Sequence, residues 1–262
     1  MNRRSLLSIA AALLVASALA GCSGSKSGTT LPGGAHLAKG QILIRYEGNA
    51  QVEIQIPSGH RILIDVWDKA SLSAPPSAND ILLTTHSHDD HYVAPFVDAF
   101  PGKKLTFEVG PLHTSEFDVT GISTVHDDGL ADGSDFIYVI DVAGFRIVHF
   151  GDFGASKLTD AQLAAIGNVD VAISQLANSF SSMDEINRKG INQMNQVKPK
   201  ILIPTHLSSA TATEAAAQWS ATYSTHPLTL SRDRLPATTT ICFMGDQASS
   251  LGSLLKLSPA SW

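Results

Sequence analysis

The sequence predicts an α/β fold, a mixed sandwich in which helices lie outside two sheets. Two patterns along the chain lead to this prediction. In the first half, short β-branched runs follow one another with glycine-containing turns between them. In the second half, apolar runs of strand length alternate with segments that begin with helix-capping residues. Hydrophobic residues make up 44% of the 262 residues, which supports a substantial core.

The first half of the chain is predicted to be mostly strand. Strands are expected at residues 41–46, 51–56, 61–66, 80–85, 105–109, 121–125, 136–142 and 145–150. The first three are separated by short turns that contain glycine, so they form a meander. Residues 92–100 favour a helix, which Pro101-Gly102 ends. A hairpin turn at Ala143-Gly144 joins the last two strands.

The second half has clearer helix signals. Helices are expected at residues 159–166, 182–197 and 211–223, and strands at 169–174, 200–204 and 238–244. Each helix begins with a serine or threonine that is followed three residues later by glutamate or glutamine, the spacing of a capping box. The first helix ends at Gly167, and the second must end before Pro199.

Residues 1–21 have the features of a bacterial lipoprotein signal peptide. Arg3 and Arg4 precede an apolar stretch that is too short to span a membrane comfortably. Its exit, Leu19-Ala20-Gly21-Cys22, resembles a lipobox, in which the cysteine becomes the lipidated N-terminus of the mature chain. We therefore expect lipidation of Cys22 and a lipid-anchored protein of the bacterial cell envelope, facing outside the cytoplasm. The alternative is an ordinary cleaved signal in which Cys22 is incidental.

Residues 22–34 are rich in glycine and serine and predict a flexible tether, which leaves residues 35–262 as one domain. Loss of the two arginines of the signal leaves 16 basic against 24 acidic side chains, a net charge of about −8. This charge argues against a nucleic-acid partner, whose phosphates need a basic surface. With Cys22 lipidated, only Cys242 remains, and its apolar surroundings predict a buried strand residue without a disulfide.

The stretch that carries chemistry follows the strand predicted at 80–85. It reads His86-x-His88-x-Asp90-His91, so three of the ten histidines of the chain lie within six positions. At the His and Asp content of this chain, such a pattern arises by chance in about one chain in a thousand. A solvated polar turn therefore explains this stretch poorly.

Three further polar residues come just after predicted strands, namely His126, Asp152 and His206. Ligand sites in open α/β sheets collect at the carboxyl ends of strands, so these side chains are expected to meet the first cluster. Imidazole with some carboxylate suits zinc and similar divalent metals. Seven such ligands exceed the needs of one tetrahedral zinc and suffice for two metals that share a carboxylate and bind a bridging hydroxide.

Together these residues resemble the signature of the metallo-β-lactamase superfamily, an HxHxDH stretch followed by His, Asp and His ligands in that order. The resemblance spans most of the mature chain and implies a four-layer αβ/βα sandwich and a metal-dependent hydrolase. It assigns His86, His88 and His126 to a first metal, Asp90, His91 and His206 to a second, and Asp152 to both. The di-iron redox branch tends to replace the second histidine of the stretch with glutamate. The set therefore favours two zinc ions, with manganese or iron as alternatives.

Within the superfamily, the chain is similar to the branch of ascorbate-phosphate lactonase-like and related hydrolases. The matching stretches are YEGNAQVEI with the strand end LIDVW, and SSMDEINRKGINQMNQVKPKILIPTH. The chain has Gly48-Asn49 where the branch usually has Gly-His, so Asn49 is a candidate replacement for a polar group over the metals. The branch usually has Asp-Pro where this chain has Asp65-Val66. Asp65 is a candidate to fix the tautomer of a ligand histidine. A strand-end aspartate bonded to backbone is the alternative for Asp65.

The other histidines are expected to serve structure or to face solvent. His149 is expected in the core or at the surface rather than on a metal, and His113 in an exposed loop. His36, His60 and His226 lie in tether, turn and pre-proline contexts and are expected to be solvated.

Four polar loop residues complete the set. Asp127 and Asp128 flank His126 and are expected to form a solvated pair, with orientation of His126 as the alternative role. Asn178 and Ser179 follow a predicted strand at a point where a substrate loop is expected.

The sequence thus predicts a hydrolase whose metal-bridging hydroxide attacks an ester, lactone, amide or phosphodiester. Asp90 and Asp152 are the candidate catalytic carboxylates, to orient the nucleophile and to pass a proton to the leaving group. The expected partner is a small-molecule substrate, with membrane contact only through the anchor. The alternatives are a lipoprotein that binds metal or ligand without turnover and an iron-dependent redox enzyme of the same fold. A β-lactamase is not favoured, because no distinct lysine for a substrate carboxylate lies near His206.

Overall fold

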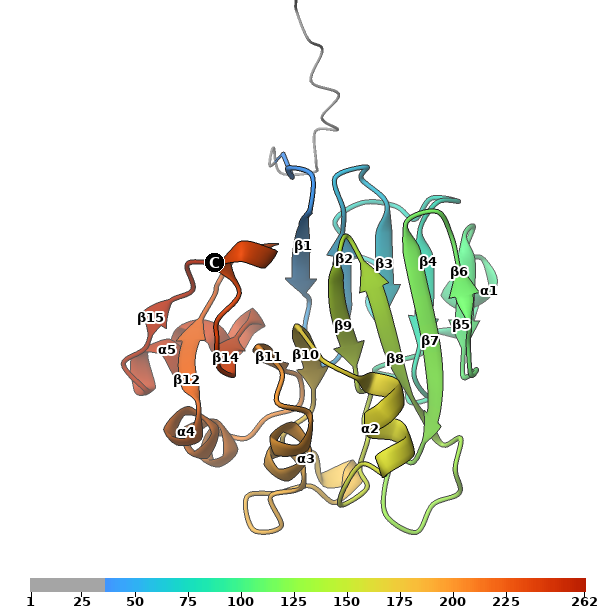
Figure 1. The fold of residues 1–262 in the computed structure, drawn as a ribbon. Coiled ribbons are helices and arrows are strands. Elements are labelled where there is room, and N and C mark those ends of the chain that lie inside the picture. Colours follow the sequence, from blue (N-terminus) through green and yellow to red (C-terminus); the bar gives the residue numbers. More distant parts are fainter. Residues whose placement is uncertain (1–35) are drawn as a thin grey trace, which may run out of the picture.

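A computed structural model describes residues 36–262, which form two sheets packed face to face with helices outside them (Figure 1). The predictions of a signal peptide, of lipidation at Cys22 and of a tether fall outside the described residues. No helix within residues 36–262 has the length and apolar character needed to cross a bilayer. Cys242 is buried and free, as its apolar run predicted.

The first sheet has six strands within the described residues, in the order β13-β1-β2-β3-β4-β5. Its strands are β1 (Gln41–Tyr46), β2 (Val52–Gln55), β3 (Arg61–Ile64), β4 (Ile81–Thr84), β5 (Lys103–Thr106) and β13 (Leu228–Ser231). β1, β2 and β3 pair antiparallel, which confirms the predicted meander, and β3, β4 and β5 run parallel. The sequence did not predict β13.

The second sheet has nine strands within the described residues, in the order β15-β12-β14-β11-β10-β9-β8-β7-β6. Its strands are β6 (Leu112–His113), β7 (Phe117–Thr124), β8 (Asp135–Val142), β9 (Phe145–His149), β10 (Val171–Ser174), β11 (Ile201–Pro204), β12 (Ser220–Tyr223), β14 (Thr240–Phe243) and β15 (Ser258–Pro259). β8 and β9 form the predicted hairpin, with positive φ at Ala143 and Gly144. From β9 to β12 the neighbouring strands are parallel.

The helices lie on the outer faces of the two sheets. They are α1 (Ala94–Asp98), α2 (Asp160–Ile166), α3 (Lys189–Val197), α4 (Ser209–Gln218) and α5 (Ala248–Leu254), with 3₁₀ turns η1 (Ser179–Ser181), η2 (Arg232–Arg234) and η3 (Gly245–Gln247). Val97 and Phe100, at α1, pack on the outer face of the first sheet, and residues of α2 to α5 pack on that of the second. A third cluster of buried side chains fills the space between the sheets. This arrangement confirms the four-layer αβ/βα sandwich.

The helix predicted from Ser182 begins only at Lys189 and ends at Val197 as expected. Ser182 has a left-handed backbone with a φ of 49°, whereas a capping residue needs an extended one. Its hydroxyl donates to the carboxylate of Asp127 on another loop. A tertiary contact therefore replaces the predicted capping box.

The third predicted helix is also shorter than expected. α4 begins at Ser209, because the side chain of Ser208 caps it by accepting from the amide of Thr211, and it ends at Gln218. Residues 220–223 form the strand β12, which pairs with β14 in the sheet. Pairing with a distant strand overrides the local preference for helix.

Arg61 is a buried cation that ties the segment after β3 to the first sheet. Its side chain is 4% exposed and donates to the carboxylates of Glu53 and Asp80 at 3.0 Å and 2.8 Å. It also donates to the backbone carbonyls of Ala74 and Pro75 at 3.0 Å and 2.9 Å. A buried cation with all of these acceptors holds the segment at the edge of β3 and β4.

Replacement of Arg61 by Met is expected to lower the free energy of unfolding by about 3–5 kcal/mol, because two carboxylates then stay buried without their cation. Lys69→Met, at an exposed position of the same segment, is the matched control and should change it by less than about 0.5 kcal/mol. Urea denaturation measures both. A loss below about 1 kcal/mol for Arg61→Met would show that the network does not carry this stability.

Candidate metal centre

The ends of four strands deliver the predicted ligands to one edge of the sandwich. His86 lies just after β4, His126 just after β7, Asp152 after β9 and His206 after β11. These strands all end at the lower edge in Figure 1, where the two sheets meet the connecting loops. The fold therefore brings together side chains that are far apart in the sequence.

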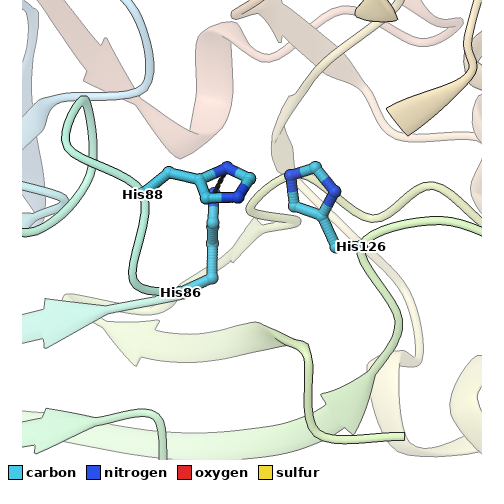
Figure 2. A group of neighbouring side chains, drawn as sticks. All are labelled: His86, His88 and His126. Atoms are coloured by element: carbon cyan, nitrogen blue, oxygen red, sulfur yellow. Dashed lines mark hydrogen bonds between the residues drawn. The ribbon is translucent and has the colours of Figure 1, made fainter. Parts of the chain in front are cut away.

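His86, His88 and His126 form the first group (Figure 2). One ring nitrogen of each lies within 4.8 Å of the others, and Nε2 of His86 is 3.2 Å from Nδ1 of His88. His86 and His126 are buried, whereas His88 is exposed. Three imidazole nitrogens at this spacing could hold one metal ion.

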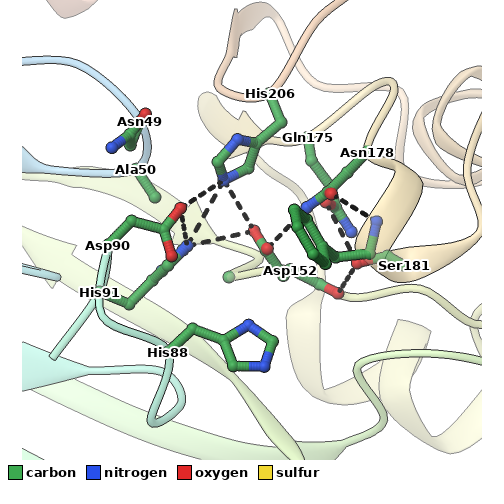
Figure 3. Close-up of polar contacts among 12 residues, drawn as sticks. Asn49, Ala50, His88, Asp90, His91, Asp152, Gln175, Asn178, Ser181 and His206 are labelled. Carbon is green, nitrogen blue, oxygen red and sulfur yellow. Dashed lines mark hydrogen bonds and ion pairs between the residues drawn. The ribbon is translucent and has the colours of Figure 1, made fainter.

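Asp90, His91 and His206 form the second group (Figure 3). Nε2 of His91 is 3.4 Å from Nε2 of His206. Oδ2 of Asp90 lies 3.8 Å and 4.0 Å from these same two nitrogens. This group could hold a second metal ion.

Asp152 lies between the two groups and turns one carboxylate oxygen to each. Its Oδ2 is 3.5 Å from Nε2 of His126 and 3.9 Å from Nε2 of His86. Its Oδ1 is 3.3 Å from Nε2 of His206 and 3.5 Å from Nε2 of His91. Burial alone would raise the pKa of this carboxyl, but the surrounding histidines hold that pKa well below its usual range. An ionised carboxylate in this position is suited to bridge two cations.

The donor atoms fit a divalent metal. Nε2 of His126 and Oδ1 of Asp152 are buried and have no hydrogen-bond partner. Buried polar atoms are normally paired, so these two unpaired atoms, both within the cluster of candidate ligands, are candidates to bind a metal ion. Imidazole with one or two carboxylates is the donor set that zinc prefers.

Asp65 makes the contact with a ligand histidine that the sequence suggested. Its buried carboxylate lies 2.9 Å from Nδ1 of His91 and accepts from the amide and the hydroxyl of Thr85, each at 2.8 Å. Burial disfavours the charged imidazole, but the negative charge of Asp65 outweighs burial and raises the pKa of His91 to about 9. The contact leaves Nε2 of His91 pointing at the centre.

Asp135 is a partner of the site that the sequence did not reveal. Its buried Oδ1 lies 3.3 Å from Nδ1 of His86 and accepts from the amide of Asp152 at 3.1 Å. Burial, together with the charge of Asp152, raises the pKa of Asp135 well above its usual value. Gly151 has a φ of 54°, and a Cβ there would lie 2.4 Å from Oδ1 of Asp135, so only glycine fits. The available signal was an aspartate at the start of the otherwise apolar run 135–140.

Asp127 and Asp128 are partly solvated as expected, with side chains 25% and 50% exposed, but both also contact a buried lysine. Lys189 is only 8% exposed, and its ammonium contacts the two carboxylates at 3.2 Å and 3.0 Å. It also donates to the carbonyl of Gly154 at 2.9 Å. One buried cation therefore joins the loop of His126 to the loop of Asp152.

A pocket of 730 Å³ opens beside the centre, lined in part by Asn49, His88, Asp90, Asp152, Asn178 and His206. Asn178 donates to Oδ2 of Asp152 at 2.7 Å, so the loop that follows β10 reaches the centre. Asn49 has a φ of 48°, and the hydroxyl of Tyr46 donates to its carbonyl at 2.5 Å. Because Asn49 also lines this pocket, it borders the site, as its position in the sequence suggested.

Within the described residues, the remaining histidines are not part of the groups that could hold a metal ion. His149 is fully buried, with Nε2 3.1 Å from the carbonyl of Ala50, so it is a core residue as expected. His113 is exposed as expected and pairs with Asp118. His36 and His226 are exposed. His60 departs from the prediction, because it is half-buried and pairs with Glu116.

Asp65→Asn is expected to weaken zinc binding about 10- to 100-fold, because the amide cannot hold His91 in the required tautomer. Asparagine tolerates the positive φ of 48° at this position, so the backbone should persist. Competition with a chromophoric chelator measures the affinity. Asp118→Asn, which removes the exposed partner of His113, is the matched control and should bind zinc as the wild type does. Unchanged affinity in Asp65→Asn would contradict the proposed contact.

The comparisons with known proteins agree with this geometry. Residues 43–206 match the β-lactamase superfamily domain. A UPF0173 metal-dependent hydrolase of Koribacter versatilis is 24% identical over 201 residues, which cover 63% of this chain and 84% of the relative. A UPF0173 metal-dependent hydrolase of Natranaerobius thermophilus is 25% identical over 167 residues, covering 56% of this chain and 73% of the relative.

One solved structure supports the fold. A candidate Zn-dependent hydrolase of the metallo-β-lactamase superfamily from Thermotoga maritima has a TM-score of 0.58 and 18% identity. The match covers 78% of this chain and all of the other. Because the family match spans most of the domain and agrees with the fold, the chain belongs to the metallo-β-lactamase superfamily, as do relatives named metal-dependent hydrolases.

Proposed function

We propose that this protein is a dizinc hydrolase that cleaves an ester, lactone, amide or phosphodiester bond in a small molecule. The observation that carries the proposal is the position of Asp152, whose two oxygens face two separate groups of histidines. A site for a single zinc would not require a carboxylate with both oxygens directed at imidazoles. Two zinc ions in these groups would generate a nucleophile from water at neutral pH and would polarise the bond to be cleaved.

The proposed ligands are the seven predicted residues. His86, His88 and His126 would hold one ion, Asp90, His91 and His206 the other, and Asp152 both. Asp65 contacts Nδ1 of His91, which faces away from the centre. Thr85 and Asp135 contact Nδ1 of His86, which also faces away from the centre. These outer contacts keep the remaining nitrogens directed inward.

Asp90 is the proposed acid–base group. Its side chain is 42% exposed, lines the pocket and lies beside His91 and His206. It is therefore placed to orient a water molecule and to carry a proton to the leaving group. Asp152 is 3% exposed and accepts from Asn178, so it serves mainly as the bridge.

Two narrower proposals rest on the sequence. The lipobox-like Leu19-Ala20-Gly21-Cys22 supports lipidation of Cys22 and a place in the bacterial cell envelope. The stretches around residues 46–67 and 181–206 support a place near the ascorbate-phosphate lactonase-like branch. Asn49, where that branch usually has histidine, supports a substrate different from those of the branch.

The decisive measurement is zinc content together with hydrolysis of a lactone, a phosphodiester and a β-lactam. We expect about two zinc ions per chain and turnover of at least one non-β-lactam substrate. Protein purified without added metal that contains iron and lacks hydrolytic activity would favour the redox alternative. Bound zinc without turnover of any substrate would favour a binding protein.

His88→Ala and Asp152→Ala are expected to lower zinc content and to reduce kcat/KM at least about 100-fold, because each removes a proposed ligand. The circular dichroism spectrum should be retained. His113→Ala, which removes an exposed histidine outside the centre, is the matched control and should keep both zinc and activity. Full activity of either ligand variant without metal would refute the proposal.

A further inference from the structure

The 3₁₀ turn η1 presents a large apolar side chain at the mouth of the metal pocket. Phe180, in the middle of η1, is 80% exposed and lines the 730 Å³ pocket together with the candidate ligands. An aromatic ring in water forgoes the free energy that burial would supply. A ring that faces a ligand pocket recovers this free energy when an apolar group binds beside it.

The exposure of Phe180 is imposed by a tightly bonded turn. Asn178 accepts from the amide of Phe180 at 2.9 Å and exchanges two backbone hydrogen bonds with Met183 at 3.0 Å and 2.9 Å. The hydroxyl of Ser181 donates to the carbonyl of Asp152 at 3.3 Å, and that of Ser182 donates to Asp127 at 2.6 Å. The turn is therefore anchored on the same residues that build the centre.

The amide of Asn178 connects the turn to the chemistry directly (Figure 3). Its oxygen accepts from Phe180 while its nitrogen donates to Oδ2 of Asp152 at 2.7 Å. The backbone of Phe180 is thus tied to the carboxylate that would bridge the metals. A substrate in this pocket would lie beside the turn, because Phe180 and Asp152 line the same space.

The other residues that line the pocket indicate which kind of substrate group could bind there. Tyr46, Ala177 and Leu207 provide further apolar surface around the opening. Asp89 and Asp90 line the same pocket, and their negative charges oppose an anionic group at the mouth. The lining thus combines apolar surface with acidic side chains.

We propose that Phe180 is the specificity-determining residue, and that it packs on an uncharged aliphatic or aromatic group next to the bond to be cleaved. This inference rests on the proposed function, because it assumes that the substrate reaches the metals through this pocket. It narrows the substrate to an ester, lactone or amide with an apolar acyl or ring portion.

Binding of two hydroxamic acids tests the inference independently of the unknown substrate. Acetohydroxamic and benzohydroxamic acid bind zinc through the same group and differ in their apolar portion. Calorimetric titration of the zinc-loaded protein gives the ratio of their dissociation constants. We expect benzohydroxamic acid to bind the wild type about tenfold more tightly, a difference of about 1.4 kcal/mol.

Phe180→Ala should reduce this ratio to about two by weakening only the aromatic ligand, and Phe180→Leu should give an intermediate value. Ile186→Ala is the matched control, because Ile186 is 86% exposed on the same segment but is not part of the pocket lining. It should keep the wild-type ratio. Zinc content and the thermal unfolding temperature of each variant should match those of the wild type.

The possible outcomes distinguish a failure of the proposed role of Phe180 from a failure of the proposed hydrolase function. An equal ratio in the wild type and Phe180→Ala, with tight binding of both acids, would overturn the role of Phe180 and leave the hydrolase intact. Loss of the ratio in Ile186→Ala as well as Phe180→Ala would overturn it too. Failure of both acids to bind a protein that contains two zinc ions would count against the metal centre as a reaction site, and the inference would fall with it.

Discussion

The buried carboxylate of Asp152 is the group on which the arrangement of the site depends. It is 3% exposed, and each of its oxygens faces imidazole nitrogens at 3.3–3.9 Å. An ionised carboxylate in such a place needs positive charge around it, and metal ions held between it and the histidines would supply that charge. Oδ1 has no hydrogen-bond partner of its own, and a cation held between it and the histidines would give it a partner.

Two further buried carboxylates lie beside the histidines, and their pKa values are shifted in opposite directions. Burial acts to raise the pKa of Asp65, but its contact with His91 and the nearby imidazoles of His149 and His86 hold that pKa below the usual value. Asp135 faces Asp152, so burial and a like charge raise its pKa well above the usual value. The histidines around Asp65 favour its charged form, whereas the neighbouring carboxylate of Asp152 disfavours the charged form of Asp135.

The loops around the centre are held by contacts that cross between them. Lys189 joins the loops of His126 and Asp152, and Asn178 joins the turn η1 to Asp152. A shift of any one loop would therefore disturb both the ligands and the wall of the pocket. This coupling anchors the backbone of the surface turn that carries Phe180 beside the proposed reaction site.

The sequence by itself determined the parts of this protein that depend on neighbours along the chain. The cluster from His86 to His91, the capping box at Thr159 and the apolar strand runs were all legible, because each is a local pattern. Strand ends also indicated His126, Asp152 and His206, since parallel strands bring such residues to one edge.

Only the tertiary structure decided the features whose partners lie far away in the chain. His206 and His91 are 115 residues apart, and Lys189 lies 62 residues from Asp127. No role was predicted for Asp135, and Ser182 was predicted to cap a helix, whereas contacts across the fold place Asp135 beside His86 and Ser182 on Asp127. The residues of β12 were predicted to be helical from their local preference, but they pair with β14 in the sheet. Hydrogen bonds and charges between distant segments outweigh weak local preferences, and a single sequence does not reveal which distant segments will meet.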